Sequence, residues 1–248
     1  PAKQLLIVIV GAPGTEEYRT RFDSWAMRWK VAADRADADC TMIGTAADST
    51  PDLDRLTTVI NESVSVETTE PLWLVFIGHG TFDGRTASLN LNGPDISAEK
   101  LARLLLPAKR PLAFIACASC SAPLLNALSA PNRVLISATK DGNQIQFSRF
   151  GDAMSQAIGG LDADINRDGQ TSLLEAWLFA SRRTAEYYAT EGRLATEHAL
   201  LDDNGDHKGT RAEAYEADRL RTNIENADQL DGSTAARWYF IRSEEERR

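Results

Sequence analysis

The chain has 248 residues, of which 43% are hydrophobic and 25% are charged, as is typical of a folded globular protein. Its net charge of −9, with no basic run, argues against a nucleic-acid partner. No apolar run approaches the roughly 18 residues that a membrane span needs. The three cysteines, Cys40, Cys117 and Cys120, are too few for a disulfide scaffold. These features predict a globular protein with its own hydrophobic core.

Apolar strands alternate with amphipathic helices along the first part of the chain. Apolar runs predict strands at residues 5–10, 72–77, 112–116 and 133–138, and a shorter run predicts one at 40–43. Helical spacing predicts helices at about 16–33, 52–59, 98–106 and 124–128. No small-residue cleavage site follows the first apolar run, so it predicts a strand and not a signal peptide. The alternation is typical of an α/β fold with a mostly parallel sheet.

The segment from about residue 159 is more acidic and mostly helical in its pattern, with two loops rich in Asp and Asn. Its clearest helix is expected at 173–188. We expect residues 1–158 to form the main domain. Residues 159–248 are then a C-terminal extension that packs on the same domain.

Two of the apolar strands end in residues that can do chemistry. His79 and Gly80 follow the strand at 72–77, and Cys117 follows the strand at 112–116. Because ligands bind outside the carboxyl ends of strands in open α/β sheets, the pair is a candidate site. An imidazole helps to generate a nucleophilic thiolate, and the N–H groups of Gly80 and Cys117 could stabilise an oxyanion.

Two other interpretations of these residues stay open, a purely structural role and a redox motif, and a zinc site is disfavoured. A free cysteine is often only a small core residue, and a single histidine after a strand is often a loop residue. Cys117 and Cys120 also form a Cys-x-x-Cys pair at a strand-to-helix junction, where redox motifs occur. A zinc site needs more Cys or His nearby than the chain offers.

Together the two motifs resemble the caspase-like fold of cysteine peptidases, and within it the legumain (asparaginyl endopeptidase) family. Residues 79–84, His-Gly-Thr-Phe-Asp-Gly, are similar to that family's His-Gly-Ser-x-Gly and one residue longer. Residues 116–121, Ala-Cys-Ala-Ser-Cys-Ser, are similar to its Ala-Cys-Glu-Ser-Gly-Ser. Residues 17–20, Glu-Tyr-Arg-Thr, correspond to its Asn-Tyr-Arg-His, with Glu17 in place of the asparagine. Gly78 stands where the family has an aspartate before its histidine.

The resemblance implies a three-layer αβα sandwich and cleavage of peptide bonds. Cys117 would be the nucleophile, and His79 would activate the thiol or protonate the leaving amine. Arg19 would line the pocket for the residue before the cut, which in this family is Asn or Asp. Ser119, in the nucleophile motif, and Ser137, at the end of the fifth strand, are further candidates for binding substrate.

A calcium-binding loop is predicted in the C-terminal extension. Residues 164–175 match the EF-hand loop at positions 1, 3, 5, 6 and 12, with Gly169 at the turn. The expected Ca²⁺ ligands are oxygen atoms of Asp164, Asn166, Asp168, Gln170 and Glu175. Residues 202–213 form a second, less complete loop, with His207 where the turn glycine belongs. It is either a degenerate ion site or a polar turn.

The preferred hypothesis is a cysteine endopeptidase of the legumain and caspase-like type, with a peptide or protein substrate and bound Ca²⁺. One alternative is a catalytically inactive caspase-like module that binds partners in a calcium-dependent way. The other is a Cys-x-x-Cys dithiol redox protein. The calcium loop slightly favours an extracytoplasmic location, and the oligomeric state is not indicated.

Overall fold

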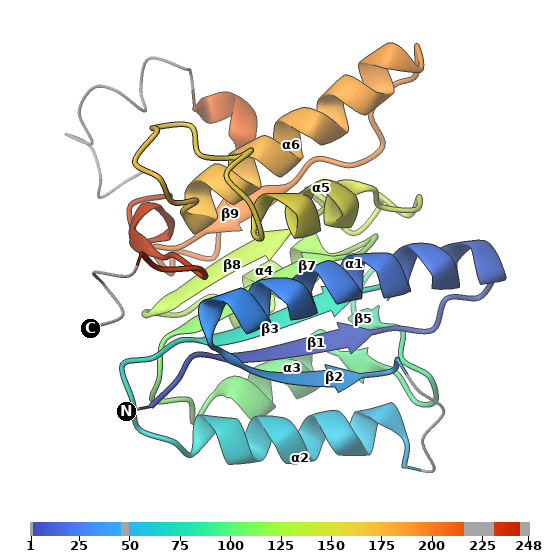
Figure 1. The fold of residues 1–248 in the computed structure, drawn as a ribbon. Coiled ribbons are helices and arrows are strands. Elements are labelled where there is room, and N and C mark those ends of the chain that lie inside the picture. Colours follow the sequence, from blue (N-terminus) through green and yellow to red (C-terminus); the bar gives the residue numbers. More distant parts are fainter. Residues whose placement is uncertain (1, 46–49, 216–230, 244–248) are drawn as a thin grey trace.

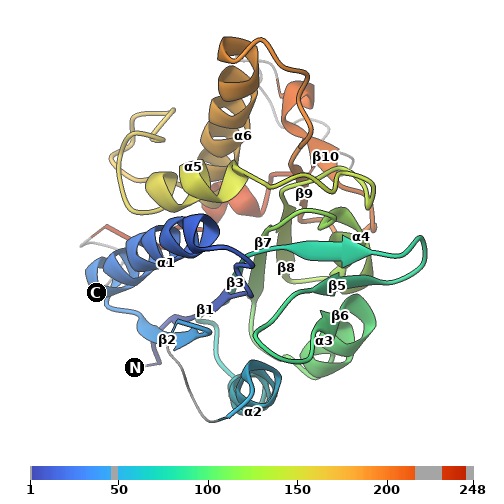
Figure 2. The ribbon, with the colours of Figure 1, turned by 90° about the vertical axis from the view of Figure 1, so that its right-hand side faces the viewer.

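In a computed structural model of the chain, which describes residues 2–45, 50–215 and 231–243, a seven-stranded sheet forms the centre of the molecule. The order of its strands is β10-β9-β8-β7-β3-β1-β2 (Figure 1; β10 is labelled in Figure 2). Five strands of this sheet are parallel to one another: β1 (Leu5–Val10), β2 (Asp39–Ile43), β3 (Leu72–Ile77), β7 (Leu112–Cys117) and β8 (Arg133–Ser137). The predicted parallel sheet is therefore confirmed.

Helices cover both faces of the sheet and complete a three-layer αβα sandwich (Figures 1 and 2). On one face lie α1 (Glu16–Ala36), α5 (Phe150–Ala157) and α6 (Leu173–Thr190). On the other face lie α2 (Asp52–Val64), α3 (Ala98–Leu105) and α4 (Ala122–Leu128). None of the helices in the described ranges is long and apolar enough to cross a membrane.

The amphipathic pattern of α1 explains its place on the sheet. Its apolar side buries Phe22, Trp25 and Trp29 against the central strands. The hydroxyl of Thr15 caps the helix by accepting a hydrogen bond from the N–H of Tyr18. The helix runs to Ala36, three residues beyond the predicted end at residue 33.

A second, antiparallel sheet follows His79. Its strands are β4 (Gly80–Phe82), β5 (Ala87–Leu89) and β6 (Ile96–Ser97). It packs with α3 and α4 in the second apolar cluster. Gly80 is thus both the residue after the candidate histidine and the first residue of a strand.

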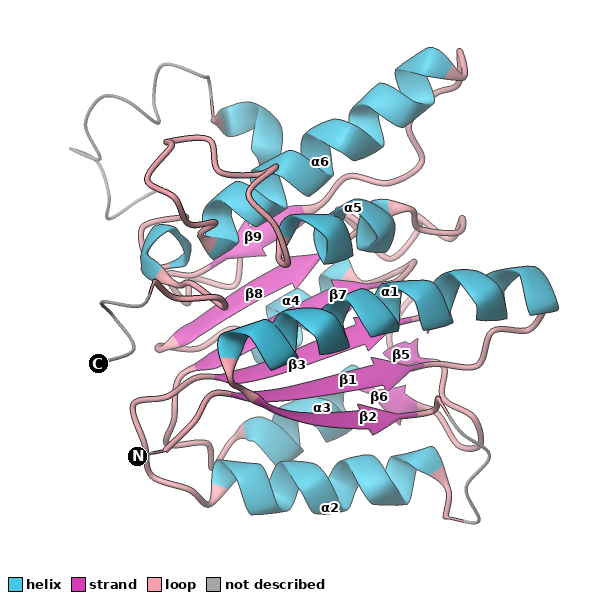
Figure 3. Ribbon diagram, viewed as in Figure 1, coloured by secondary structure: helices cyan, strands magenta, loops and turns pink. Residues whose placement is uncertain are grey.

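The C-terminal segment adds strands as well as helix, so it is less helical than predicted (Figure 3). Strand β9 (Leu200–Asp202) pairs antiparallel with β8, and β10 (Thr210–Arg211) pairs with β9. Two short 3-10 helices, η1 (Ala212–Ala214) and η2 (Ala235–Arg237), follow. This segment therefore continues the main sheet and shares its core.

Candidate active site

Strands β3 and β7 are neighbours, so His79 and Cys117 do lie at the same edge of the sheet. Ile77 is the register partner of Cys117, and the N–H of Gly78 donates to the carbonyl oxygen of Cys117 at 3.3 Å. His79 lies two residues beyond Ile77. In this register the residue opposite His79 is the one two positions beyond Cys117, which is Ser119.

The thiol of Cys117 lies in the apolar core beneath this edge. Cys117 is 1% exposed, and a Cβ atom added to Gly151 would lie 2.8 Å from the Cβ of Cys117. Burial, together with the nearby Glu197 carboxylate, raises the pKa of this thiol far above its usual range. Among the described residues, no hydrogen bond joins Cys117 to His79. In this conformation the thiol stays protonated at neutral pH.

Ser119 is the side chain that directly contacts the His-Gly motif. Its hydroxyl accepts a hydrogen bond from the N–H of Gly80 and donates one to the carbonyl of Gly80, both at 3.2 Å. Glycine is required at position 80, because a Cβ there would lie 2.3 Å from the carbonyl oxygen of Ser119. Ser119 thus lies beside the histidine motif, where the strand ends in the sequence predicted Cys117.

The imidazole of His79 is held by one polar contact and surrounded by aromatic rings. Its Nε2 lies 3.3 Å from the carbonyl oxygen of Pro13 and donates to it. The rings of Tyr18, Phe22 and Phe147 approach it with centroid distances of 4.9, 5.3 and 6.2 Å. Because a carbonyl oxygen only accepts, this contact uses Nε2 as the donor and leaves Nδ1 as a hydrogen-bond acceptor in the neutral ring.

The other two predicted substrate-binding residues point elsewhere. Arg19 lies on the exposed side of α1, where its side chain is 51% exposed and Nε is 3.4 Å from a Glu16 oxygen. Ser137 is fully buried, and its hydroxyl donates to the carbonyl of Thr139 at 2.9 Å. The three cysteines are all free, and Cys120 has a left-handed backbone (φ 54°). The redox interpretation stays a prediction.

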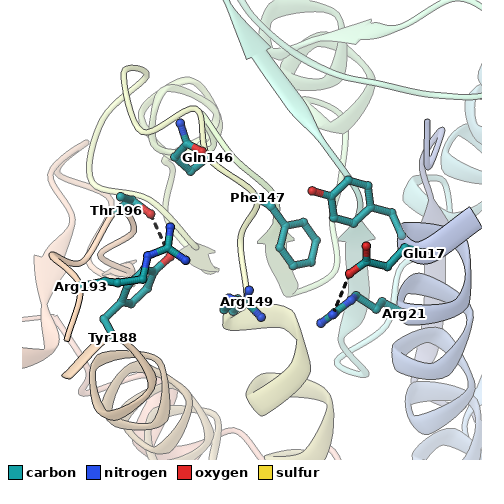
Figure 4. A pocket seen from close by; sticks show the side chains of 9 residues that line it. Glu17, Arg21, Gln146, Phe147, Arg149, Tyr188, Arg193 and Thr196 are labelled. Atoms are coloured by element: carbon teal, nitrogen blue, oxygen red, sulfur yellow. Dashed lines mark hydrogen bonds and ion pairs between the residues drawn. The ribbon is translucent and has the colours of Figure 1, made fainter. Parts of the chain in front are cut away.

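A small pocket next to His79 brings together arginines that the sequence analysis did not select. It has a volume of about 120 Å³, and Figure 4 shows its side chains. The lining residues are Glu17, Tyr18, Arg21, Gln146, Phe147, Arg149, Tyr188, Arg193 and Thr196. Tyr18 and Phe147 line the pocket and also contact the imidazole of His79. The pocket is therefore separated from the histidine by a single layer of side chains.

The charge of this pocket is positive. Glu17 neutralises Arg21, since the two side chains pair at 2.9 Å. Neither Arg149 nor Arg193 has an ion pair within the described part of the chain. The guanidinium of Arg149 lies over the ring of Tyr187, 4.0 Å from its centroid. Two arginines without a counter-ion and an adjoining aromatic ring suit a carboxylate ligand.

Glu197 is buried between this pocket and Cys117 and fixes the start of α5. Its carboxylate accepts hydrogen bonds from the hydroxyl of Ser148 and from the backbone N–H groups of Arg149 and Phe150. The hydroxyl of Tyr188 also donates to it, at 3.2 Å. Burial raises the pKa of Glu197. A carboxylate far away in the sequence thus supplies the helix cap.

The predicted calcium loop forms a tight turn before α6. Asp164 accepts hydrogen bonds from the N–H groups of Asp168 and Gly169. Both oxygens of Glu175 are occupied, by the N–H groups of Ile165 and Asn166 and by Ser172. Two more predicted ligands accept hydrogen bonds within the loop: Asn166 from the N–H of Asp168, and Asp168 from the N–H of Gln170. The fifth, Gln170, is expected to offer its backbone carbonyl, and its side-chain oxygen accepts from the N–H of Ser243.

The carboxylate and amide oxygens of this loop are of the kind that Ca²⁺ binds. Across the residues that the structure describes, however, no three His, Cys, Asp or Glu side chains gather closely enough to hold a metal ion. Calcium binding by this loop therefore stays a prediction, and it requires Glu175 to exchange its present partners for the ion.

No protein-family model and no curated protein matches the chain. Its fold is similar to that of GSU0716 from Geobacter sulfurreducens, with 12% identity, a TM-score of 0.52, and coverage of 80% of this chain and 92% of that one. The Drosophila initiator caspase Dronc is 14% identical, with a TM-score of 0.55 and coverage of 83% and 80%. Caspase-1 from Spodoptera frugiperda is 11% identical, with a TM-score of 0.50 and coverage of 81% and 85%.

The likeness to two caspases confirms the caspase-like fold. At 11–14% identity it shows the fold alone and not the activity. The narrower resemblance to legumain stays a prediction.

Proposed function

We propose that this caspase-like protein binds peptide segments through the carboxylate of an acidic residue, without cleaving them in the conformation described. The observation that carries the proposal is the arginine-lined pocket next to His79. The guanidinium groups of Arg149 and Arg193 form no ion pair in the described part of the chain, and the nearby Glu197 bonds to the backbone N–H of Arg149 and not to its side chain. A pocket volume of about 120 Å³ suits a small ligand group such as one acidic side chain.

The absence of cleavage follows from the surroundings of the thiol of Cys117 and the hydroxyl of Ser119. Cys117 is buried under Trp25 and Gly151, and burial opposes the thiolate that attack requires. The residue beside Gly80 is Ser119, whose hydroxyl is engaged with that glycine. A bound peptide would therefore meet the His-Gly edge without meeting a nucleophilic sulfur.

The binding proposal is tested by fluorescence anisotropy with a matched pair of labelled peptides, one carrying Asp and the other Asn at the same position. We expect the Asp peptide to bind about tenfold more tightly, because one paired charge is worth roughly 1.4 kcal/mol here. Arg193→Gln should remove this preference, whereas Arg103→Gln, an exposed change on α3, should preserve it. Equal binding of the two peptides by the wild type would refute the proposal.

A cysteine peptidase of the legumain and caspase-like type, cutting after Asn or Asp, is the second candidate. It is supported by the caspase-like fold and by the position of His79 and Cys117 at the ends of neighbouring strands. Catalysis would need α5, whose Gly151 packs against Cys117, to move so that Cys117 is exposed.

We would incubate the wild type, Cys117→Ala and His79→Ala with a mixed peptide library, with calcium and with a chelator, and identify products by mass spectrometry. The binding proposal expects no cleavage by any of them. Cleavage by the wild type that both substitutions abolish would establish the peptidase instead.

Calcium binding at residues 164–175 is part of both candidates. The loop leads directly into α6, and Tyr188 near the other end of that helix lines the pocket. We propose that Ca²⁺ in this loop stabilises α6 and thereby the pocket wall. The same peptide titration, repeated with Asp164→Asn and with chelator, tests this link: unchanged affinity in both would exclude it.

A further inference from the structure

The second acidic loop, residues 202–208, contains a buried carboxylate oxygen that has no partner. Asp202 is 1% exposed and ends β9. Its Oδ1 accepts a hydrogen bond from the N–H of Gly205, so the carboxylate faces the loop. Its Oδ2 is buried and forms no hydrogen bond. Leaving a buried carboxylate oxygen without a partner is costly, so this position calls for a cation or another donor.

The charge around Asp202 points to a cation. Asp203 and Asp231 are also buried, and the N–H of Asp203 donates to Asp231 at 3.0 Å. Within the described ranges, none of these three carboxylates forms an ion pair with a Lys, Arg or His side chain. Buried charges are normally paired or bound to a metal. Hydrogen bonds satisfy two of the three carboxylates: Asp203 accepts from the N–H groups of Gly232, Thr234 and Ala235, and Asp231 also accepts from the hydroxyl of Thr210. Asp202 is the one of the three with a carboxylate oxygen left for a cation.

The backbone of this loop repeats that of the predicted calcium loop. Counting from Asp202 and from Asp164 as position 1, positions 4 and 6 have left-handed φ angles in both loops. These residues are Gly205 (78°) and His207 (65°) here, and Arg167 (62°) and Gly169 (87°) in the other loop. His207 thus adopts the turn that the sequence pattern assigns to glycine. At positions 1, 3 and 5 both loops carry Asp, Asn and Asp in this order.

We propose that residues 202–208 bind a Ca²⁺ ion through the side chains of Asp202, Asn204 and Asp206 and the backbone carbonyl of Lys208. Carboxylate, amide and carbonyl oxygens are the ligands of this hard cation. Glu213, at position 12, pairs instead with Arg211 at 2.7 Å. With one carboxylate fewer than an EF-hand loop, the affinity should lie in the weak range, with a Kd of about 0.1–1 mM.

The site is tested in the full chain carrying Asp164→Asn, which removes the first ligand of the other loop. In this parent, we expect calcium to raise the melting temperature relative to chelator and calorimetry to detect one weak site. Adding Asp206→Asn, an exposed change, should weaken calcium binding at least tenfold without changing the melting temperature in chelator. Adding Asp54→Asn, an exposed aspartate on α2, should change neither quantity.

Asp202→Asn separates a binding role from a structural one. It removes the uncompensated charge, so the melting temperature in chelator should stay the same or rise, while the calcium-dependent increase is lost. A variant that is equally destabilised with and without calcium would overturn the proposal. So would a parent that shows no calcium effect, or an Asp206→Asn variant that binds as well as the parent. If Asp202→Asn fails to fold, the Asp206→Asn titration decides alone.

Discussion

The hydroxyl of Ser119 lies 3.2 Å from both the N–H and the carbonyl oxygen of Gly80, the residue that follows His79. This contact joins the segment after β7 to the start of β4. It places a serine, and not a thiol, beside the histidine motif. The chemistry available at this edge of the sheet therefore depends on which of Cys117 and Ser119 a peptide can reach.

Ser119→Ala should destabilise the protein by about 1–2 kcal/mol, because it removes both hydrogen bonds to Gly80 from a buried position. The denaturation midpoint in urea measures this loss. Ser65→Ala is a suitable control, since Ser65 is exposed and bonds only within its own helix. Equal midpoints for the two variants would mean that the Ser119 contact contributes nothing.

Cys117 should be the thiol most protected from alkylation. Burial raises its pKa and excludes reagent, whereas Cys40 is only partly buried. Timed treatment of the native protein with iodoacetamide, followed by peptide mass spectrometry, should show Cys40 modified first and Cys117 modified only after unfolding. Faster modification of Cys117 than of Cys40 at neutral pH would instead indicate an accessible, activated nucleophile and favour the peptidase.

Glu197→Ala should cost about 3 kcal/mol, because it leaves the buried N–H groups at the start of α5 and the Ser148 hydroxyl without their acceptor. Glu197→Gln retains one acceptor oxygen and should cost less. Both are read from urea midpoints, with the exposed Glu62→Ala as control. If Glu197→Ala lowers the free energy of unfolding by less than about 1 kcal/mol, water replaces the carboxylate as acceptor at the start of α5.

Asp231 should make stability depend on pH in the acidic range. Burial raises its pKa to about 6 from the ordinary value of 3.8, so the folded state binds the proton more tightly than the unfolded state. Its contribution therefore favours folding below the unfolded pKa and is lost as the pH rises from about 4 to 6. Asp231→Asn should be more stable than the wild type at pH 7 and should flatten this part of the profile of unfolding free energy against pH. An unchanged profile would contradict the shift.

Much of the fold follows from local patterns in the sequence. Strands β1 and β3 coincide with continuous apolar runs, because strands buried on both faces need no polar alternation. The helical stripe of Phe22, Trp25 and Trp29 likewise identifies the buried side of α1. The position of His79 after β3 also follows, since Gly78 and Gly80 interrupt the apolar pattern around it.

Tertiary structure decided the composition of the site. The sequence places Cys117 at a strand end, but only the register of β7 against β3 brings Ser119 to the side of Gly80. The arginine pocket could not be predicted, because Arg21, Arg149 and Arg193 come from segments that meet only after folding. The cap of α5 by Glu197 is equally non-local, and no signal near residue 150 indicates it.

The sequence alone thus determined the α/β class, the strand ends and the acidic loops, since these depend on the periodicity and chemistry of neighbouring residues. Which thiol is buried, which arginines converge and which carboxylate oxygen lacks a partner depend on contacts between distant segments. Hydrophobic burial drives those contacts, but it specifies no partner until the sheet order and register are fixed.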